Sequence, residues 1–237
     1  MTENIKTGDV LEAWKEVVES GQPHSSVRLG DAQIIVAAHE EILSMKFVNK
    51  LCRWANDHLP DSKLPDKKLQ EQLVWALHQA DFLGVFCQTE HWNLKPLSDM
   101  VIQYYDIKPS RFFYAFDNFY ISKDPRFYEY FKDTKVLLIG AKAGKLKEVL
   151  ERRYGWTGIA GTVDCPNWKS FEKAMSEMDK YKYRLALVSA GVPGTILASY
   201  AKHTGHVGIS FGSGADTCIQ ADADGVNTWE WDKNPVY

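Results

Sequence analysis

The second half of the chain alternates between apolar runs typical of strands and apolar positions spaced as in helices. Residues 135–139 (KVLLI) and 185–189 (LALVS) are continuous apolar runs, as expected for parallel strands buried on both faces of a sheet. Residues 144–153 repeat apolar positions three and four apart, which predicts an amphipathic helix. The same patterns predict strands at 112–116, 157–163 and 206–211 and helices at 167–179 and 193–204.

The first half of the chain is predominantly helical in pattern. Apolar residues at helical spacing over 8–19 predict a helix that Gly21 and Pro23 end. A short strand predicted at 25–29 leads into a Gly-Asp turn. Further helices are predicted at 34–43, 47–58, 67–79 and 94–105, and a further strand at 82–86.

This alternation predicts an α/β fold: a mostly parallel, Rossmann-like sheet flanked by helices, with the helical N-terminal part packed on it. No internal repeat and no long linker interrupts the 237 residues, a length suited to one large domain. We therefore expect a single domain over 1–237, with an N-terminal helix in 1–23, a core over 24–216 and an acidic, Trp-rich tail over 217–237.

Composition and charge narrow the class of protein. A hydrophobic fraction of 45% and a charged fraction of 25% are ordinary for globular proteins, so a packed core is expected. The net charge of −3 gives no strong basic field, which argues against bulk nucleic-acid binding. No long apolar run indicates a membrane span, and the polar first ten residues lack a signal-peptide hydrophobic region, so we expect a cytoplasmic location. Four widely spaced cysteines, expected to be reduced thiols, are Cys52, Cys87, Cys165 and Cys218.

Ligands of parallel sheets bind at the carboxyl ends of the strands, so the loops that follow predicted strands are the candidate sites. In the first loop, Arg28 and Asp31 flank Gly30 immediately before a helix. An arginine there can pair with a phosphate, and an aspartate can hold a divalent metal bound to a diphosphate. The alternative is structural: Asp31 caps the helix and Arg28 lies on the surface.

Three further loops combine small residues with the start of a helix, where backbone N–H groups bind anions. The second loop follows KVLLI and carries two lysines, but it matches neither GxGxxG nor GxxxxGK[ST]. The third follows LALVS and is the best generic anion cradle in the chain, and the fourth follows the last strand. For each loop the alternative is an ordinary tight turn. The residues that we assign to phosphate binding in these loops are Gly140, Lys142, Gly191, Gly194, Thr195, Ser213 and Asp216.

His39 and Glu40 are the candidates for a general base. They lie about two turns into the helix that follows Asp31, where they either approach the same pocket or face solvent. His91, beside Trp92 in a predicted loop, is better explained as structural. The histidines show no metal-ligand spacing, and no GxSxG elbow supports a hydrolase of that type.

Two separated blocks of the sequence resemble one family. Residues 26–31, SVRLGD, are similar to the R-[FYL]-G-D-G-E loop of GT-D-type bacterial glycosyltransferases. Residues 185–216, LALVSAGVPGTILASYAKHTGHVGISFGSGAD, resemble the later block of that family, in which a strand, an aGp.gk loop and a helix precede g..aiDiGh..d. The order, the spacing and the intervening KVLLIG strand agree, and the resemblance covers roughly residues 24–216.

The resemblance implies transfer of a hexose from a nucleotide-diphosphate sugar, most often a UDP-sugar, to a glycan or glycoprotein acceptor. It also implies a D-x-E motif that binds a divalent metal, manganese or magnesium, with Asp31 as the first carboxylate and metal ligand. In this interpretation Arg28, the amides of residues 191–195 and Lys142 hold the diphosphate.

Four positions depart from the family pattern. Gln33 stands in place of the motif Glu and Ala32 in place of its Gly, while Ser210 and Ser213 replace an Asp and a His of the later block. A neutral amide is a poorer ligand for a hard cation than a carboxylate is. The departures therefore leave open a metal-independent transferase, a shifted ligand such as Glu40, or a catalytically silent relative.

Two other functions stay open. KVLLIGAKAGKLKEVL resembles the first strand, glycine loop and helix of methyltransferases that use S-adenosylmethionine, although Lys142 stands at the central glycine position. Asp164 supplies the acidic residue that such a fold places at the end of the second strand. The other alternative is a non-catalytic binding or scaffold module that kept the fold and lost the metal motif. The sequence does not fix the oligomeric state, and a homo-oligomer is left open.

Overall fold

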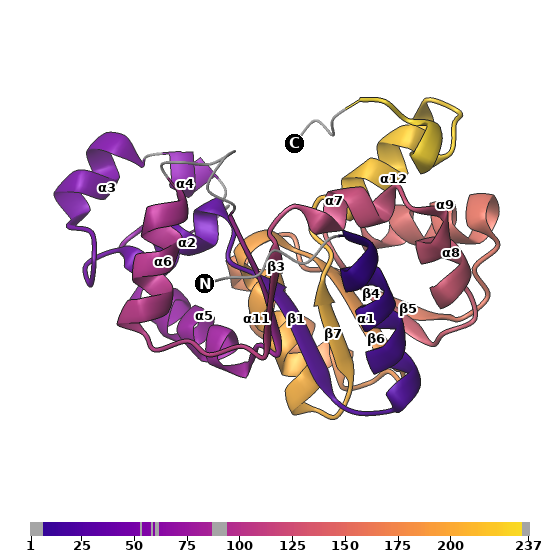
Figure 1. Cartoon of the computed structure of the whole chain (residues 1–237), viewed down its shortest axis with the longest axis horizontal. Coiled ribbons are helices and arrows are strands. Elements are labelled where there is room, and N and C mark those ends of the chain that lie inside the picture. Colours follow the sequence, from indigo (N-terminus) through magenta and orange to yellow (C-terminus); the bar gives the residue numbers. More distant parts are fainter. Residues whose placement is uncertain (1–6, 53, 58, 60–61, 87–93, 234–237) are drawn as a thin grey trace.

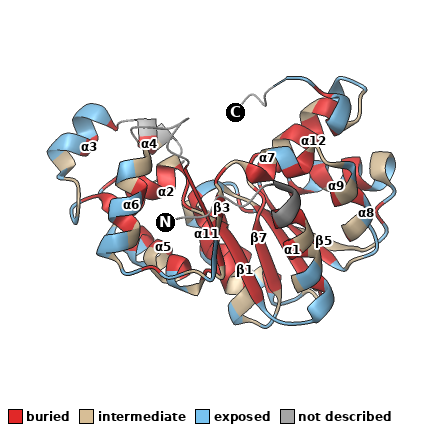
Figure 2. Cartoon of the chain, in the orientation of Figure 1, coloured by how far each residue is buried: buried red, intermediate tan, exposed pale blue. Residues whose placement is uncertain are grey.

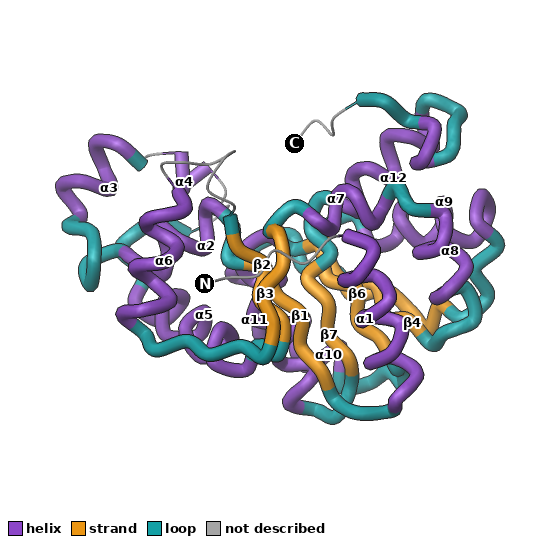
Figure 3. The backbone as a smooth tube through the Cα atoms, in the orientation of Figure 1, coloured by secondary structure: helices purple, strands orange, loops and turns teal. Residues whose placement is uncertain are grey.

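A parallel sheet of seven strands forms the centre of the molecule in the part of the chain that the structure describes (Figures 1 and 3). This computed structural model describes residues 7–52, 54–57, 59, 62–86 and 94–233, so Cys87, His91 and Trp92 lie outside the described residues. The strand order across the sheet is β3-β2-β1-β7-β6-β4-β5, and every neighbouring pair is parallel. In chain order the strands are β1 (His24–Arg28), β2 (Phe82–Val85), β3 (Arg111–Tyr114), β4 (Val136–Gly140), β5 (Ile159–Val163), β6 (Leu185–Ser189) and β7 (Val207–Ser210).

Helices cover both faces of this sheet, which confirms the predicted α/β fold (Figure 1). In chain order the α-helices are α1 (Thr7–Ser20), α2 (Asp31–Ala38), α3 (Met45–Leu51), α4 (Trp54–Asp57), α5 (Lys67–Gln79), α6 (Leu94–Tyr104), α7 (Asp117–Ser122), α8 (Pro125–Phe131), α9 (Ala143–Tyr154), α10 (Phe171–Met178), α11 (Gly191–His203) and α12 (Gly214–Ala223). Two short 3₁₀ turns complete the described elements, η1 (Trp168–Ser170) and η2 (Thr228–Glu230).

Some elements differ from the sequence prediction. The helix predicted over 47–58 is divided into α3 and α4, and the helix predicted over 34–43 ends at Ala38. The sequence pattern does not predict α7, α8 or α12. The first two are short helices in an aromatic-rich segment, six and seven residues long, and α12 (GADTCIQADA) consists mainly of small and polar residues. Helix α12 packs against α7 and α9, so the chain remains part of the layered fold beyond the last strand.

Successive side chains of the central strands alternate between two separate hydrophobic cores, one on each face of the sheet. Leu137 and Ile139 of β4 pack with α2, α5, α6, α10 and α11, and this side of the sheet is its first face. Val136 and Leu138 point to the second face, where α1, α7, α8, α9 and α12 pack. This explains the continuous apolar runs, because a strand covered on both faces has no solvent side. Figure 2 shows the buried residues concentrated in the strands and in the helix sides that cover them.

The helical connections that follow β4 and β6 lead in opposite directions across the sheet. Helix α9, which follows β4, packs on the second face and leads to the sheet edge at β5. Helix α11, which follows β6, packs on the first face and leads back toward β7. The carboxyl ends of these two neighbouring strands therefore form a topological switch point, where open α/β sheets bind ligands.

None of the described helices is both long enough and apolar enough to span a bilayer.

Truncation of a central strand residue tests the two-core arrangement. Leu138 is fully buried, so Leu138→Ala is expected to lower the free energy of unfolding by about 2–5 kcal/mol, measured by urea denaturation. Met100, which is 50% exposed, provides the control. Met100→Ala is expected to change the free energy of unfolding by no more than about 0.5 kcal/mol. Similar losses in the two variants would contradict the assignment of Leu138 to a packed core.

Candidate active site

A pocket of about 350 Å³ opens at the carboxyl ends of β1, β3, β6 and β7, and we call it the main pocket. Its lining residues come from four segments that are far apart in sequence, 28–33, 115–116, 189–192 and 212–216, together with Phe86. The first, third and fourth candidate loops therefore converge on one cavity. Of the residues predicted for binding or catalysis, those that line it are Arg28, Gly30, Asp31, Gly191, Ser213 and Asp216.

Arg28 is held in one orientation at the wall of the main pocket. Its Nη1 donates hydrogen bonds to the backbone oxygen of Ala115 and to Oδ1 of Asn118, both at 2.9 Å. Its Nη2 lies directly over Gly212, where a Cβ would come within 2.5 Å of that nitrogen. Gly212 also has a φ of 50°, a conformation that favours glycine. The guanidinium is thus a fixed positive charge in the pocket wall rather than a mobile surface group.

Asn118 joins Arg28 to the loop after β7. Its Oδ1 accepts the hydrogen bond from Arg28, and its Nδ2 donates to the backbone oxygen of Phe211 at 2.8 Å and to Oγ of Ser213 at 2.9 Å. The side chain is completely buried. The sequence analysis missed this residue because it missed α7. The available signal was the polar pair Asp117-Asn118 directly after an aromatic strand, at the end of the sheet where ligands bind.

Gln33 ties the start of α2 to the start of α11. Its buried Nε2 lies 3.4 Å from the backbone oxygen of Gly191 and 3.4 Å from Oγ1 of Thr195. The Thr195 hydroxyl in turn donates to the backbone oxygen of Arg28 at 3.3 Å. Thr195 is completely buried, and Gly194 packs beside it against Val188, so both support the main pocket from behind rather than lining it.

Helices α2, α9, α11 and α12 are among those that begin at this edge of the sheet. Their N-cap residues, Gly30, Lys142, Ala190 and Ser213, make no side-chain capping hydrogen bond. The N-cap side chains of α3, α5 and α8, in contrast, each accept a hydrogen bond from a backbone N–H of their helix. The first turn of a helix has N–H groups without an intrahelical partner and carries a partial positive charge. This edge of the sheet therefore favours anions.

The second candidate loop contributes at the rim. Lys142 Nζ forms an ion pair with Oδ1 of Asp216 at 2.5 Å, and Asp216 lines the main pocket. Gly140 has a packing role, because a Cβ there would lie 2.2 Å from the backbone oxygen of Ser189. The loop thus brings one further positive charge to the mouth of the main pocket.

The main pocket offers two carboxylates as possible ligands of a divalent metal, Asp31 and Asp216. Asp31 accepts a hydrogen bond from the backbone N–H of Ala32 at 2.8 Å, and Asp216 is paired with Lys142. Gln33 uses its amide nitrogen to tie two helices together. Within the described residues no three acidic, histidine or cysteine side chains gather as a metal site. The D-x-E motif implied by the resemblance therefore has one carboxylate here, Asp31, rather than two.

His39 and Glu40 lie away from the main pocket. The eight residues of α2 separate them from Asp31 by about 12 Å along the helix. His39 is completely buried, with Nδ1 2.6 Å from the backbone oxygen of Val36 and Nε2 accepting from the backbone N–H of Asp66 at 3.2 Å. Glu40 is exposed beyond the end of the helix, with a φ of 62°. Of the three candidate catalytic residues, Asp31 is the one that lines the pocket.

Comparison with known families places the chain in one of them. Residues 5–218 match the GT-D fold-like domain, and the chain belongs to this family. A search of curated proteins finds no match to the sequence. The family expected from the two sequence blocks is therefore confirmed.

Solved structures of the domain of unknown function 1792 have a similar fold. One, described as having a distinct glycosyltransferase fold, is 15% identical, with 100% of this chain and 91% of that chain covered and a TM-score of 0.58. Another, described as a new glycosyltransferase from Streptococcus sanguinis, is 14% identical, with coverages of 100% and 95% and a TM-score of 0.58. The likeness shows that this chain has a glycosyltransferase-type fold.

Substitution of Gly212 tests the close packing around Arg28. Gly212→Ala is expected to lower the free energy of unfolding by about 2–3 kcal/mol in urea denaturation, because the new methyl group meets both backbone strain and the guanidinium. Gly225 is a matched control, since its φ is 80° and no atom lies within 4 Å of an added Cβ. Gly225→Ala is expected to cost only about 1 kcal/mol from strain. Equal losses in the two variants would contradict a crowded guanidinium.

Proposed function

We propose that this chain is a glycosyltransferase that moves a hexose from a nucleoside-diphosphate sugar, with a UDP-sugar as the expected donor, to a glycan or glycoprotein acceptor. The observation that carries the proposal is the placement of a fixed arginine and uncapped helix N-termini around one pocket. The family and the glycosyltransferase-type fold support it. The donor and acceptor classes come from the sequence resemblance.

The main pocket has the groups that a diphosphate requires. Arg28 offers a planar guanidinium that pairs with phosphate oxygens. Gly191 and Val192 bring the start of α11, with its partial positive charge, into the same pocket. As the bond from the sugar to the diphosphate breaks, negative charge grows on the leaving oxygen. Fixed positive groups of this kind stabilise that charge without reorganising.

Asp31 is the carboxylate that we expect to contact the reacting sugars. It begins α2 at the wall of the main pocket and has one oxygen engaged by its own helix. Its other oxygen is free of that hydrogen bond and suits a hydroxyl of the acceptor or donor sugar. If the reaction inverts the anomeric centre, this carboxylate is the general base that removes the acceptor proton.

We expect the donor to bind without a divalent metal. The positive charge that a metal would bring to a diphosphate is supplied by Arg28 and by Lys142 at the rim. The neutral Gln33 takes the place of one expected carboxylate, so the main pocket also has less negative charge to offset. Arg28 and the starts of α2 and α11 are the positive groups that would face an anionic donor directly.

Calorimetric titration of the protein with UDP tests the proposed function. UDP is expected to bind in the micromolar range in the presence of EDTA, and manganese is expected to change the dissociation constant by less than about threefold. Arg28→Gln is expected to weaken UDP binding about 10-fold to 100-fold through loss of charge-assisted hydrogen bonds.

Arg111 provides the control for that variant. Arg111 is exposed at the amino end of β3, and the main pocket lies at the carboxyl ends of the strands. Arg111→Gln is therefore expected to leave UDP binding unchanged. Absence of UDP binding with and without manganese would count against the proposed function as a whole. Binding that requires manganese would contradict only the metal-free part.

Replacement of Gln33 by the glutamate of the family motif tests whether the loop after β1 works without a metal or has lost its metal site. Because a carboxylate cannot donate to the Gly191 oxygen, Gln33→Glu is expected to lower the free energy of unfolding by about 1–3 kcal/mol and to create no manganese site. Gln33→Met, which removes the hydrogen bonds without adding charge, is the control and is expected to be less destabilised. Titration with manganese alone and a donor-hydrolysis assay complete the measurement. A gain of manganese-dependent hydrolysis would instead support a silent relative that lost its metal motif.

A further inference from the structure

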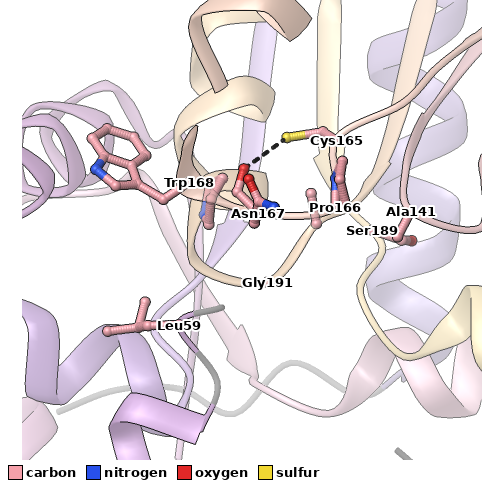
Figure 4. Close-up of a pocket in the computed structure, with 10 residues that line it drawn as sticks. Leu59, Ala141, Cys165, Pro166, Asn167, Trp168, Ser189 and Gly191 are labelled. Carbon is pink, nitrogen blue, oxygen red and sulfur yellow. Dashed lines mark hydrogen bonds between the residues drawn. The ribbon is translucent and has the colours of Figure 1, made fainter. Parts of the chain in front are cut away.

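A second cavity of about 260 Å³ lies beside the main pocket, and we call it the side pocket. It opens where β4, β5 and β6 end, and it shares Ser189 and Gly191 with the main pocket. Figure 4 shows Trp168 and Leu59 on one side of Gly191 and Ala141 and Ser189 on the other. The two cavities therefore meet at the start of α11.

The side pocket occupies the topological switch point of the sheet. Ala141 follows β4 and Ser189 ends β6, the two neighbouring strands whose following helices pack on opposite faces. In open α/β sheets this crevice is the position where ligands bind. The main pocket lies to one side of it, over β1 and β7.

The two cavities differ in charge. Arg28, Asp31 and Asp216 line the main pocket, whereas no acidic or basic side chain lines the side pocket among the described residues. Burial raises the pKa of the Cys165 thiol, so this group also stays neutral at physiological pH. The side pocket thus suits an uncharged group, and the main pocket suits a charged one.

The walls of the side pocket suit a flat ring. Trp168, with Pro166 and Pro193, provides apolar surface, and the indole is held against the ring of Phe171 at a centroid distance of 4.8 Å. The turn that carries Trp168 is closed by a capping box between Asn167 and Ser170, so the aromatic surface is fixed. Nucleobases stack on fixed aromatic side chains of this kind.

A serine at the wall of the side pocket has a hydroxyl without a hydrogen-bond partner among the described residues. Oγ of Ser189 is buried and makes no hydrogen bond to the described residues. Buried hydroxyl groups normally have a partner, and rotation of the Ser189 side chain toward the cavity would let this one bind a molecule there. Ser189 itself lines both cavities.

We propose that the side pocket binds the nucleobase and ribose of the donor, with the base against Trp168 and the diphosphate crossing Ser189 and Gly191 into the main pocket. This inference rests on the proposed function. It orients the donor along the sheet edge, so that the sugar to be transferred lies on the side of Asp31 and Phe116. The acceptor then approaches from the β1 and β3 side.

Comparison of UDP with inorganic pyrophosphate tests the inference, because pyrophosphate has no base or ribose. By calorimetry, Trp168→Ala is expected to weaken UDP binding about 10-fold and to leave pyrophosphate binding within about twofold. Trp168→Phe keeps an aromatic ring and is expected to retain most of the UDP affinity. Trp229→Ala is the matched control, since this indole is 42% exposed and lines neither pocket, and it is expected to bind both ligands normally.

A second variant avoids any dependence on the folding of the Trp168 turn. Ala141 is exposed at the wall of the side pocket, so Ala141→Phe is expected to fill that cavity, weakening UDP but not pyrophosphate. Equal effects on the two ligands, or no effect of either substitution on UDP, would overturn the inference while leaving the proposed function in place. If the unmodified protein binds neither UDP nor pyrophosphate, the proposed function falls together with the inference.

Discussion

The position of the Arg28 guanidinium is the constraint on which the geometry of the main pocket depends. A positive charge at the end of a buried strand is costly unless it is hydrogen-bonded, and here Ala115 and Asn118 accept from it. The space that it occupies exists because residue 212 has no side chain. Asn118 extends the same network to Ser213. The Arg28 side chain, together with Asn118, therefore fixes the relative positions of the loops after β1, β3 and β7.

The topology of the sheet explains why those loops face an anion. Parallel strands bring the starts of the following helices to one edge, and at this edge the N-cap residues of α2, α9, α11 and α12 leave their helices without side-chain caps. Elsewhere in the fold, helices such as α5 and α8 are capped by their own aspartates. At the helices around the pocket, a bound anion can take the place of the missing cap.

The sheet and the candidate loops could be predicted because their signals are local. KVLLI and LALVS have the composition of strands buried on both faces, and small residues after each strand indicate the loops. For Asn118 the local signal was only its position after an aromatic strand, and its role could not be predicted because its partners are about 90 residues away and α7 is a short helix. The role of Gln33 is similarly non-local, because it depends on Gly191 and Thr195. His39 illustrates the converse: its sequence position near Asp31 gave no information on its burial against the Asp66 backbone.

Gln33 also connects the fold to the chemistry. A glutamate in its place could not donate to the Gly191 oxygen, so the contact between α2 and α11 would lose its hydrogen bond and gain repulsion between two oxygens. The neutral amide closes this contact and removes one negative charge from the pocket at the same time. What remains are two cations, Arg28 and Lys142, and two carboxylates, one of which is already paired. The formal charges of these four groups cancel, so an anionic donor would rely on the fixed orientation of Arg28 and on the partial positive charge at the helix N-termini, and the substitution that departs from the family pattern is consistent with such a site.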